Sequence, residues 1–239
     1  MNDWRLIISG HGDPEHNMAV DEALFAEYER THRPVLRLYG WRPAGISVGV
    51  NQDMDATVYL CRCREAGVPV VRRVTGGNAI YHDDELTYSV VCSTADIGNP
   101  RGIKESYRVL CTPIIAMYER LGLRACFSRD DERCALFRRR SVFCFAAWEE
   151  YDILVNGSKI GGNAQKRRRD VILQHGSIPL SLDFALIRHL CRDVPEDAES
   201  SITSLNSLTG RIWTWEEARD RLIEAFTDNI RNRIEITVV

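Results

Sequence analysis

Two glycine-rich segments of this chain have the residue types of an acyl- or phosphate-binding site. The first runs Arg72-Arg73-Val74-Thr75-Gly76-Gly77-Asn78-Ala79-Ile80-Tyr81-His82 and places two cations beside a small-residue turn. Glycines let backbone N–H groups approach a ligand closely, and guanidinium groups supply fixed positive charge. The second, Asn156-Gly157-Ser158-Lys159-Ile160-Gly161-Gly162-Asn163-Ala164-Gln165, repeats the theme with one lysine. Together they suit an anionic or strongly polarised acyl donor.

Lys159 is a candidate functional cation because the residues before it predict a hairpin. Asn156-Gly157 is a two-residue turn signal between strands over 151–155 and 158–160. In that register Val155 opposes Ser158, Leu154 opposes Lys159 and Ile153 opposes Ile160. Alternation then places Asp152 and Lys159 on one face, one diagonal step apart. Lys159 could polarise an acyl oxygen or contact a phosphate; the alternative is a solvated strand lysine.

Cys144 is a candidate nucleophile. It lies between Phe143 and Phe145, a setting that by spacing alone is typical of a core residue. A nucleophilic thiol needs a lowered pKa or a neighbouring cation, and Lys159 could supply that cation. His82 and His175 each lie near a glycine-bearing segment, where either could be a general base or could order a turn.

Composition excludes several classes of function. The 239 residues carry a net charge of −3, and the basic clusters at 138–140 and 166–169 are local. These clusters could dock an acidic protein or a phosphate, or be solvated loops; the chain predicts no nucleic-acid binding. No apolar run approaches the roughly 20 residues of a membrane span, and the N-terminus lacks signal-peptide character. We expect a cytoplasmic protein with no membrane contact.

The eight cysteines predict thiols and no metal site. In a cytosolic chain of this size they are not expected to form a disulfide framework. Cys61-Arg62-Cys63 has one intervening residue, which is a poor zinc or redox signature. The cysteines are at positions 61, 63, 92, 111, 126, 134, 144 and 191.

The elements that must position these residues alternate irregularly. Helical spacing predicts helices over 15–30, 54–66, 107–121 and 183–191. Pro113 predicts a kink or a late start in the third of these helices. A capping box at 214–217 predicts the start of a further helix, whose buried face lies over 218–230. β-rich runs predict strands over 35–39, 46–50, 68–74, 78–81, 86–92 and 171–178, besides the hairpin. The segment 124–144 is expected to be a long loop or an insertion. The fold class is α/β (α+β), with mixed, largely antiparallel sheets flanked by helices, and residues 1–239 are expected to form a single domain.

The paired motifs resemble a known family. Arg72-Arg73-x-Thr75-Gly76-Gly77 followed by His82, then Lys159-x-x-Gly162-Asn163-Ala164-Gln165, resembles the lipoate–protein ligase and octanoyltransferase superfamily. The resemblance spans about Met18 to Phe226 and implies the biotin/lipoate–protein ligase catalytic-domain fold. It implies that Cys144 and Lys159 are catalytic. The substrate-binding residues it implies are Arg72, Arg73, Thr75, Gly76, Gly77, Asn78, His82, Gly161, Gly162, Asn163 and Ala164.

Three features resemble the branch of octanoyltransferases that uses a catalytic cysteine. Glu85-Leu86-Thr87-Tyr88-Ser89 follows the glycine loop, Cys144-Phe145 stands at the nucleophile's place, and Ile172-Leu173-Gln174-His175-Gly176-Ser177-Ile178 matches as well. Little chain follows the apolar stripe at 218–230, so we expect no separate C-terminal accessory domain of the ATP-dependent ligases. Two residues depart from the pattern: Asn78, and Ala146 where relatives often carry Asp.

The resemblance implies a reaction. The donor is octanoyl-acyl carrier protein and the acceptor is a lysine of a lipoyl domain, such as the glycine-cleavage H protein. An acyl-cysteine forms at Cys144, Lys159 stabilises the oxyanion, and Arg72 and Arg73 line the donor's approach or hold the loop. No ATP or metal is required, and we expect a monomer. The alternatives are an ATP- and Mg-dependent lipoate ligase, an amidotransferase between lipoyl domains, and a non-catalytic binding module for lipoyl domains.

Overall fold

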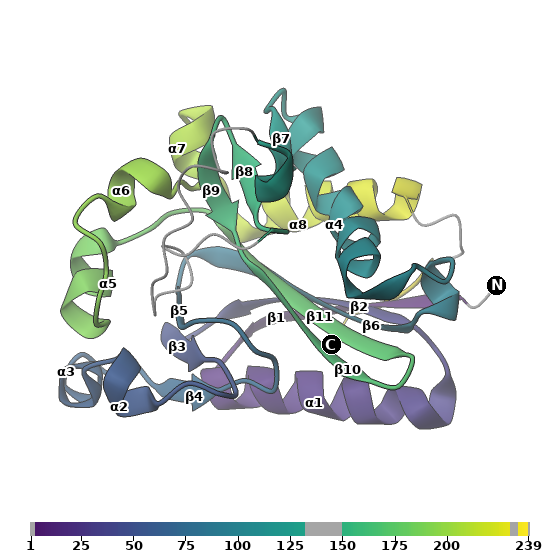
Figure 1. Ribbon diagram of the computed structural model, residues 1–239, viewed down its shortest axis with the longest axis horizontal. Coiled ribbons are helices and arrows are strands. Elements are labelled where there is room, and N and C mark those ends of the chain that lie inside the picture. The colour runs from purple at the N-terminus through teal and green to yellow at the C-terminus, as the bar shows by residue number, and fades with distance from the viewer. Residues whose placement is uncertain (1–2, 132–149, 230–233, 239) are drawn as a thin grey trace.

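The computed structural model describes residues 3–131, 150–229 and 234–238. The strands and helices are arranged as in Figure 1. The strands are β1 (Trp4–Gly12), β2 (Val35–Trp41), β3 (Gly45–Val48), β4 (Val70–Arg72), β5 (Ile80–His82), β6 (Glu85–Ser93), β7 (Ala125–Phe127), β8 (Ile153–Val155), β9 (Ser158–Gly161), β10 (Asn163–Arg168), β11 (Val171–Pro179) and β12 (Ile234–Val238). The helices are α1 (Pro14–Thr31), α2 (Met54–Thr57), α3 (Leu60–Glu65), α4 (Gly102–Arg120), α5 (Phe184–Leu190), α6 (Ala198–Ser201), α7 (Leu205–Thr209) and α8 (Trp215–Asn229), with 3₁₀ turns at Ala95–Ile97 and Ser128–Asp130.

The predicted mixed, largely antiparallel architecture is confirmed. A six-stranded sheet has the order β10-β11-β6-β2-β1-β12, and its described strands pair in parallel at β1–β2 and β1–β12 and antiparallel elsewhere. Two three-stranded sheets, β4-β3-β5 and β7-β8-β9, lie beside it. The small sheet β4-β3-β5 carries the first glycine segment, and β8–β9 is the hairpin that carries Lys159.

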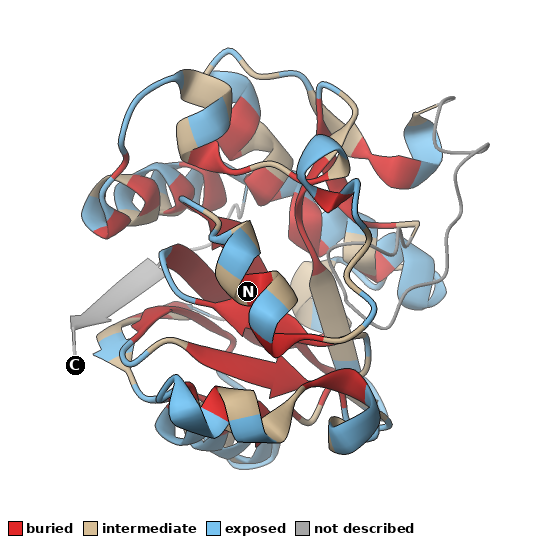
Figure 2. Ribbon diagram, turned by 90° about the vertical axis from the view of Figure 1, so that its left-hand side faces the viewer, coloured by how far each residue is buried: buried red, intermediate tan, exposed pale blue. Residues whose placement is uncertain are grey.

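Strand alternation divides the large sheet into two buried faces. Leu36 and Val90 point toward α4 and α8, in a core with Leu110 and Leu222. Their neighbours on the other face pack against α1, through Leu24 and Tyr28. Figure 1 shows α1 along one face and α4 with α8 on the other. Figure 2 shows buried residues in red along strands between these layers, and β2, β6 and β11 are buried throughout.

The predicted helix over 54–66 is wrong in its continuity. It is interrupted at Val58-Tyr59, where Val58 bridges Cys191 and the Tyr59 N–H donates to the Leu190 carbonyl at 2.8 Å. Tertiary pairing with the end of α5 therefore replaces the intrahelical hydrogen bonds, and β-branched Val58 suits the extended conformation. Of the two alternatives predicted at Pro113, the late start is wrong, because α4 begins at Gly102 and contains Pro113, and the kink stays a prediction.

The hairpin prediction is confirmed in place and partly in register. Leu154 pairs with Lys159 and Val155 with Ser158, as expected, but a bulge pairs Ile153 with Gly161 in place of Ile160. The expected loop at 124–144 begins instead with β7, which pairs with β8; residues 132–149 lie outside the described part of the chain.

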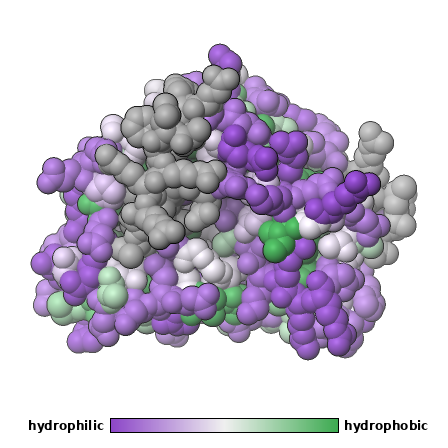
Figure 3. Space-filling view, in the orientation of Figure 1, coloured by the Kyte–Doolittle hydropathy of each residue, from purple (hydrophilic) through white to green (hydrophobic). Residues whose placement is uncertain are grey.

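The basic cluster at 166–169 is not a loop over most of its length, because β10 pairs with β11 through Arg168. The capping box of α8 is confirmed by reciprocal bonds between Thr214 and Glu217. Across the described ranges, no helix combines the length and apolarity needed to cross a bilayer. The face seen in Figure 3 is dominated by hydrophilic side chains with only small hydrophobic areas.

Candidate active site

The two glycine-rich segments meet at one cavity. It encloses about 580 Å³, part of it open to solvent. Of the predicted site residues that the structure describes, Arg73, Gly77, Asn78, His82, Gly162, Asn163 and Ala164 line it. The remaining lining residues are Met18, Tyr39, Trp41, Ser47, Ile80, Thr87, Asp152, His175, Gly176 and Ser177. The sequence therefore predicted correctly that the two segments are brought together.

The cavity lies where the α1 side of the large sheet changes from apolar to polar. Val35, Val91 and Leu173 lie in the core against α1. Further along each strand, at two-residue spacing on the same face, the side chains become polar: Arg37 and Tyr39 on β2, Ser89, Thr87 and Glu85 on β6, and His175 and Ser177 on β11. Strand register thus gathers polar groups from three strands beneath the glycine segments.

Arg72 and Arg73 both bind backbone carbonyls. Arg72 Nη1 donates to the carbonyl oxygens of Gly49, Val50 and Gln52 at 3.0, 3.1 and 2.7 Å. Arg73 is buried and donates to the carbonyls of its own loop and of β3. Its bonds go to the carbonyls of Ser47 at 2.9 Å, Gly76 at 2.8 Å and Asn78 at 2.7 Å. The arginines therefore hold the shape of the loop, and direct binding of substrate by either one stays a prediction.

Close backbone approach explains two of the glycines. A Cβ on Gly49 would lie 2.0 Å from the Gly77 carbonyl oxygen, so the glycine loop packs directly on the end of β3. Gly77 itself has φ of +86°, a conformation that side chains other than glycine rarely adopt. A Cβ on Gly161 would lie 2.4 Å from the carbonyl oxygen of Ser177. The first glycine segment therefore packs against the end of β3 in the small sheet, and the second packs against β11 of the large sheet.

Lys159 forms a buried ion pair. Its Nζ lies 2.6 Å from Asp152 Oδ2, and the two side chains are 0% and 3% exposed. The predicted diagonal relation of these residues is confirmed, and the alternative of a solvated strand lysine is wrong. Asp152 lines the cavity, so the pair sits at its wall.

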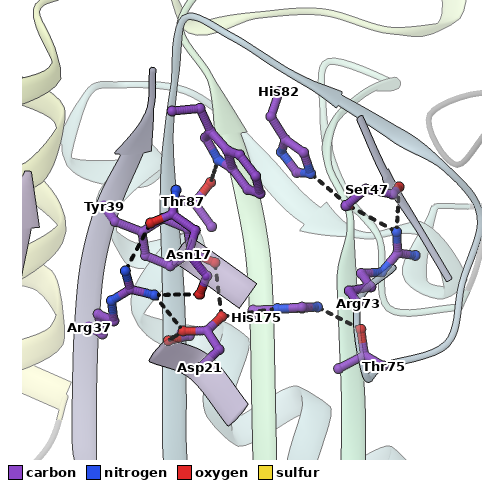
Figure 4. A network of polar contacts seen from close by, with 12 residues as sticks. Asn17, Asp21, Arg37, Tyr39, Ser47, Arg73, Thr75, His82, Thr87 and His175 are labelled. Carbon is purple, nitrogen blue, oxygen red and sulfur yellow. Dashed lines mark hydrogen bonds and ion pairs between the residues drawn. The ribbon is translucent and has the colours of Figure 1, made fainter. Parts of the chain in front are cut away.

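Ser47, His82 and Glu85 form a hydrogen-bonded chain at the cavity, and Figure 4 shows the Ser47 and His82 side chains of this chain. His82 Nε2 lies 2.7 Å from Ser47 Oγ, and His82 Nδ1 lies 2.8 Å from Glu85 Oε1. Burial raises the pKa of Glu85. The charge and hydrogen bond of His82, together with hydrogen bonds from the hydroxyl groups of Thr87 and Ser177, outweigh burial and hold the pKa of Glu85 below its ordinary value. Trp41 stacks on the imidazole at 3.9 Å between ring centroids.

His175 links β11 to the glycine loop. Its Nε2 lies 2.6 Å from Thr75 Oγ1, and its Nδ1 lies 3.4 Å from Asp21 Oδ2. Burial lowers the pKa of His175, so the imidazole is neutral near pH 7. Nδ1–H then donates to Asp21 and Nε2 accepts from Thr75.

Asp21 is held as a carboxylate by several donors. Arg37 Nη1 donates to it at 2.8 Å, Ser89 Oγ at 2.7 Å and Tyr39 Oη at 2.9 Å. Burial raises its pKa, but the hydrogen bond from His175 and the charge of Arg37 outweigh burial and leave the pKa lowered. The sequence analysis did not identify Asp21, Arg37 or Ser47 as site residues. The signal in the sequence was Arg37, a charged residue inside the apolar run of β2.

A second cavity of about 890 Å³, including space open to solvent, adjoins the first. The two share Gly77, Asp152, Asn163 and Ala164 in their linings. The second also contains Tyr107 and Tyr151, whose rings stack at 5.4 Å. Gly76 lines this cavity, whereas the predicted site residues Arg72, Thr75, Gly161 and Lys159 line neither of the two cavities.

The described cysteines are not disulfide-bonded. Burial raises the pKa of Cys63, and it raises the pKa of Cys111 and of Cys191 to about 12. Those thiols are therefore poor nucleophiles. The candidate nucleophile Cys144 lies outside the described residues. Within the described ranges, no cluster of three or more His, Cys, Asp or Glu side chains is arranged to hold a metal ion.

Solved structures share this fold. A lipoate–protein ligase A bound with ATP matches with a TM-score of 0.81 and 23% identity, covering 100% of this chain and 90% of that one. A bipartite lipoate protein ligase from Thermoplasma acidophilum matches with a TM-score of 0.78 and 21% identity, covering 100% and 88%. At these identities the likeness establishes the fold, as the motifs predicted.

Sequence comparison establishes the family. The model of the lipoyl protein ligase A/B catalytic domain matches residues 13–227. Octanoyltransferase LipM of Kyrpidia tusciae is 39% identical, over 98% of this chain and 90% of its own length. Octanoyltransferases LipM of Geobacillus kaustophilus and Bacillus subtilis are 38% and 37% identical, each over 97% of this chain and 88% of its own. The chain therefore belongs to the lipoyl protein ligase A/B catalytic domain family, and it is an acyltransferase related to the octanoyltransferases.

Proposed function

We propose that this enzyme transfers an octanoyl group from octanoyl-acyl carrier protein to a lysine of a lipoyl domain, such as the glycine-cleavage H protein, in lipoate biosynthesis. The observation that carries the proposal is the identity of 36–39% to octanoyltransferases over nearly the whole chain. The ligases that share the fold are more distant in sequence, at 21–23% identity.

The geometry of the cavity supports an acyl substrate. Met18, Trp41 and Ile80 supply apolar wall, and the glycine segments supply backbone near the polar side. Burying an octanoyl chain is worth about 0.8 kcal/mol for each CH₂ group, so an apolar wall favours the longer chain over acetyl.

In the proposed mechanism Cys144 attacks the donor thioester and forms an acyl-cysteine. Cys144 precedes Glu150, a residue of the second cavity, by six positions, a length of chain that spans at most about 20 Å. Lys159, held by Asp152, and backbone N–H groups of the glycine segments stabilise the developing oxyanion. The acceptor amine then attacks the acyl-cysteine and forms the amide.

The proposed reaction requires neither ATP nor metal. Exchange of one thioester for another is nearly balanced, and transfer from a thioester to an amine is downhill. We also propose that the chain acts as a monomer in the cytoplasm, with residues 1–239 forming a single catalytic domain.

Intact-mass measurement tests the proposal. Incubation with octanoyl-acyl carrier protein, without ATP, is expected to add one octanoyl group that hydroxylamine removes. Cys144→Ala should abolish the adduct, whereas Cys61→Ser, which changes an exposed cysteine, should retain it. A fully active Cys144→Ala variant would refute the acyl-cysteine.

The alternatives give different results in the same assay. Pyrophosphate release with free lipoate and ATP, and no adduct from the carrier thioester, would indicate a ligase. Transfer only from an octanoylated lipoyl domain would indicate an amidotransferase. Binding of a lipoyl domain without turnover would indicate a non-catalytic module.

A further inference from the structure

The second half of the proposed reaction releases a proton, and the first half does not. A thiolate that attacks a thioester displaces another thiolate, so no net proton is exchanged. Amide formation converts an amine into an amide and an acyl-cysteine into a thiolate, so one proton must leave the nitrogen, and a lysine that arrives as an ammonium group must first lose a further proton. A lysine amine has an ordinary pKa near 10.4, so only about one in 2,500 is neutral at pH 7. A proton acceptor in the cavity would therefore raise the rate of the second half only.

We propose that Ser47, His82 and Glu85 are a proton relay that deprotonates the acceptor lysine. This inference rests on the proposed function and concerns its second half. Ser47 Oγ takes a proton from the acceptor ammonium group and passes its own hydroxyl proton to His82 Nε2. The lone pair that this frees on the nitrogen forms the C–N bond, and the C–S bond to Cys144 breaks with its electrons on the sulfur. The second nitrogen proton goes to the released thiolate, and the imidazolium returns its proton to solvent.

The hydrogen bonds set the direction of the relay. Glu85 accepts hydrogen bonds from Thr87 Oγ and Ser177 Oγ, so it is an acceptor for His82 Nδ1–H as well, at 2.8 Å. With its proton on Nδ1, His82 must accept at Nε2, and the Ser47 hydroxyl is the donor at 2.7 Å. In this arrangement the carboxylate orients the imidazole, and the imidazole accepts the proton of the hydroxyl group. A histidine can then act as a general base on a substrate that contacts the hydroxyl oxygen.

Ser47 is placed for contact with substrate. It lines the cavity, whereas Glu85 is not among the lining residues. One lone pair of Ser47 Oγ accepts from Arg73 Nη1 at 3.2 Å, and the other remains for the incoming amine. The guanidinium also favours transfer of the hydroxyl proton toward His82. Ser47 is therefore the catalytic residue of the relay, and His82 and Glu85 are positioning residues.

The imidazole is locked in this orientation. Trp41 stacks on it with an interplanar angle of 8°, and the Trp41 indole N–H donates to Thr87 Oγ1 at 2.7 Å. Ser47 and His82 are diagonal neighbours across the β3–β5 pair, in which Ser47 is opposite Ile80. Figure 4 shows the His82 ring directed at Ser47, with Arg73 approaching from the other side.

The charged and titratable groups near His82 come from several elements. They are Glu85 on β6, His175 on β11, Arg73 after β4, and Asp152 before β8 at the cavity wall. A pH profile of the second half therefore reports the relay together with these neighbours, and a comparison of variants is needed.

Single-turnover kinetics test the relay. Enzyme carrying a preformed octanoyl-cysteine is mixed with an apo lipoyl domain between pH 6 and pH 10, and amide formation is followed by mass. Glu85→Gln replaces the carboxylate that accepts from His82 Nδ1–H with an amide whose NH2 can donate to Nδ1. The imidazole proton would then sit on Nε2, which could no longer accept the Ser47 hydroxyl proton. We expect the rate at pH 7 to fall roughly 100-fold or more, and to return toward wild type near pH 10 as the lysine loses its proton to solvent.

Controls separate the outcomes. Asp84→Asn makes the same chemical change at an exposed neighbour and should leave the profile unchanged. Acylation by octanoyl-acyl carrier protein should be unaffected in Glu85→Gln; absence of acylation in the wild type would instead refute the proposed function.

A loss that is equal at all pH values would show a merely structural role for Glu85 and overturn the relay. If Glu85→Gln does not fold, the Ser47→Ala variant tests the relay independently. It should show the same loss with recovery at high pH, and a wild-type rate at pH 7 in Ser47→Ala would overturn the proposal.

Discussion

The buried pair of Lys159 and Asp152 permits a prediction that separates folding from catalysis. At 2.6 Å, two unit charges attract by about 6 kcal/mol at an effective dielectric constant of about 20, offset by the desolvation of both groups. Lys159→Met removes one partner and leaves a buried carboxylate. We expect the free energy of unfolding to fall by about 3–5 kcal/mol. The melting temperature should fall by roughly 10 °C for a chain of this size.

The double variant completes the test. Lys159→Met combined with Asp152→Leu removes both charges, and replacing a buried pair with apolar groups is often neutral or stabilising. We expect urea unfolding to show that most of the lost stability returns. Acyl transfer should stay at least about 100-fold below wild type, because the cation proposed to stabilise the oxyanion is absent.

Lys104→Met is the matched control for the lysine change. Its ion pair with Glu150 is solvent-exposed, so the loss should be less than about 1 kcal/mol. Recovery of full transfer activity in the double variant would refute the catalytic role of Lys159. Unchanged stability in Lys159→Met would refute the energetic reasoning about the pair.

Three more changes are predicted. Gly49→Ala should impair both folding and transfer, because its Cβ would meet the Gly77 carbonyl at 2.0 Å, whereas Gly76→Ala meets no atom within 4 Å and should keep wild-type stability by thermal melting. Arg37→Met should cost about 3–5 kcal/mol in urea unfolding, because it leaves the buried Asp21 without its cation. The pKa of His175 is lower in the folded protein than the unfolded value near 6.5, so the unfolded state binds more protons below that pH. Stability should therefore fall as pH drops below about 6.5, less so in His175→Gln, and equal pH dependence of both proteins would contradict this.

Local patterns in the sequence predicted most elements and several contacts. The Asn156-Gly157 turn and strand alternation together placed Asp152 diagonal to Lys159, because the period of a strand is independent of what surrounds it. The capping box at Thr214 likewise depends only on residues three apart. The two glycine segments indicated a shared site, and they do line one cavity.

Predictions failed where distant residues compete with local preference. The helix over 54–66 breaks because the end of α5 supplies hydrogen bonds to Tyr59. A bulge shifts Ile153 onto Gly161, which the turn signal could not reveal. β12 pairs with β1, and that partner lies more than 200 residues away in the chain.

The sequence by itself determined the family and the two glycine segments, since these depend on residue identity and spacing. Only the tertiary structure decided what each charged group contacts. The sequence left Arg72 and Arg73 either to line the donor's approach or to hold the loop, and in the fold both donate to backbone carbonyls. Ser47 had no signal of its own and gains its place because β3 pairs with β5 beside His82. Long-range pairing brings these groups together, and no local pattern specifies which partners a side chain meets.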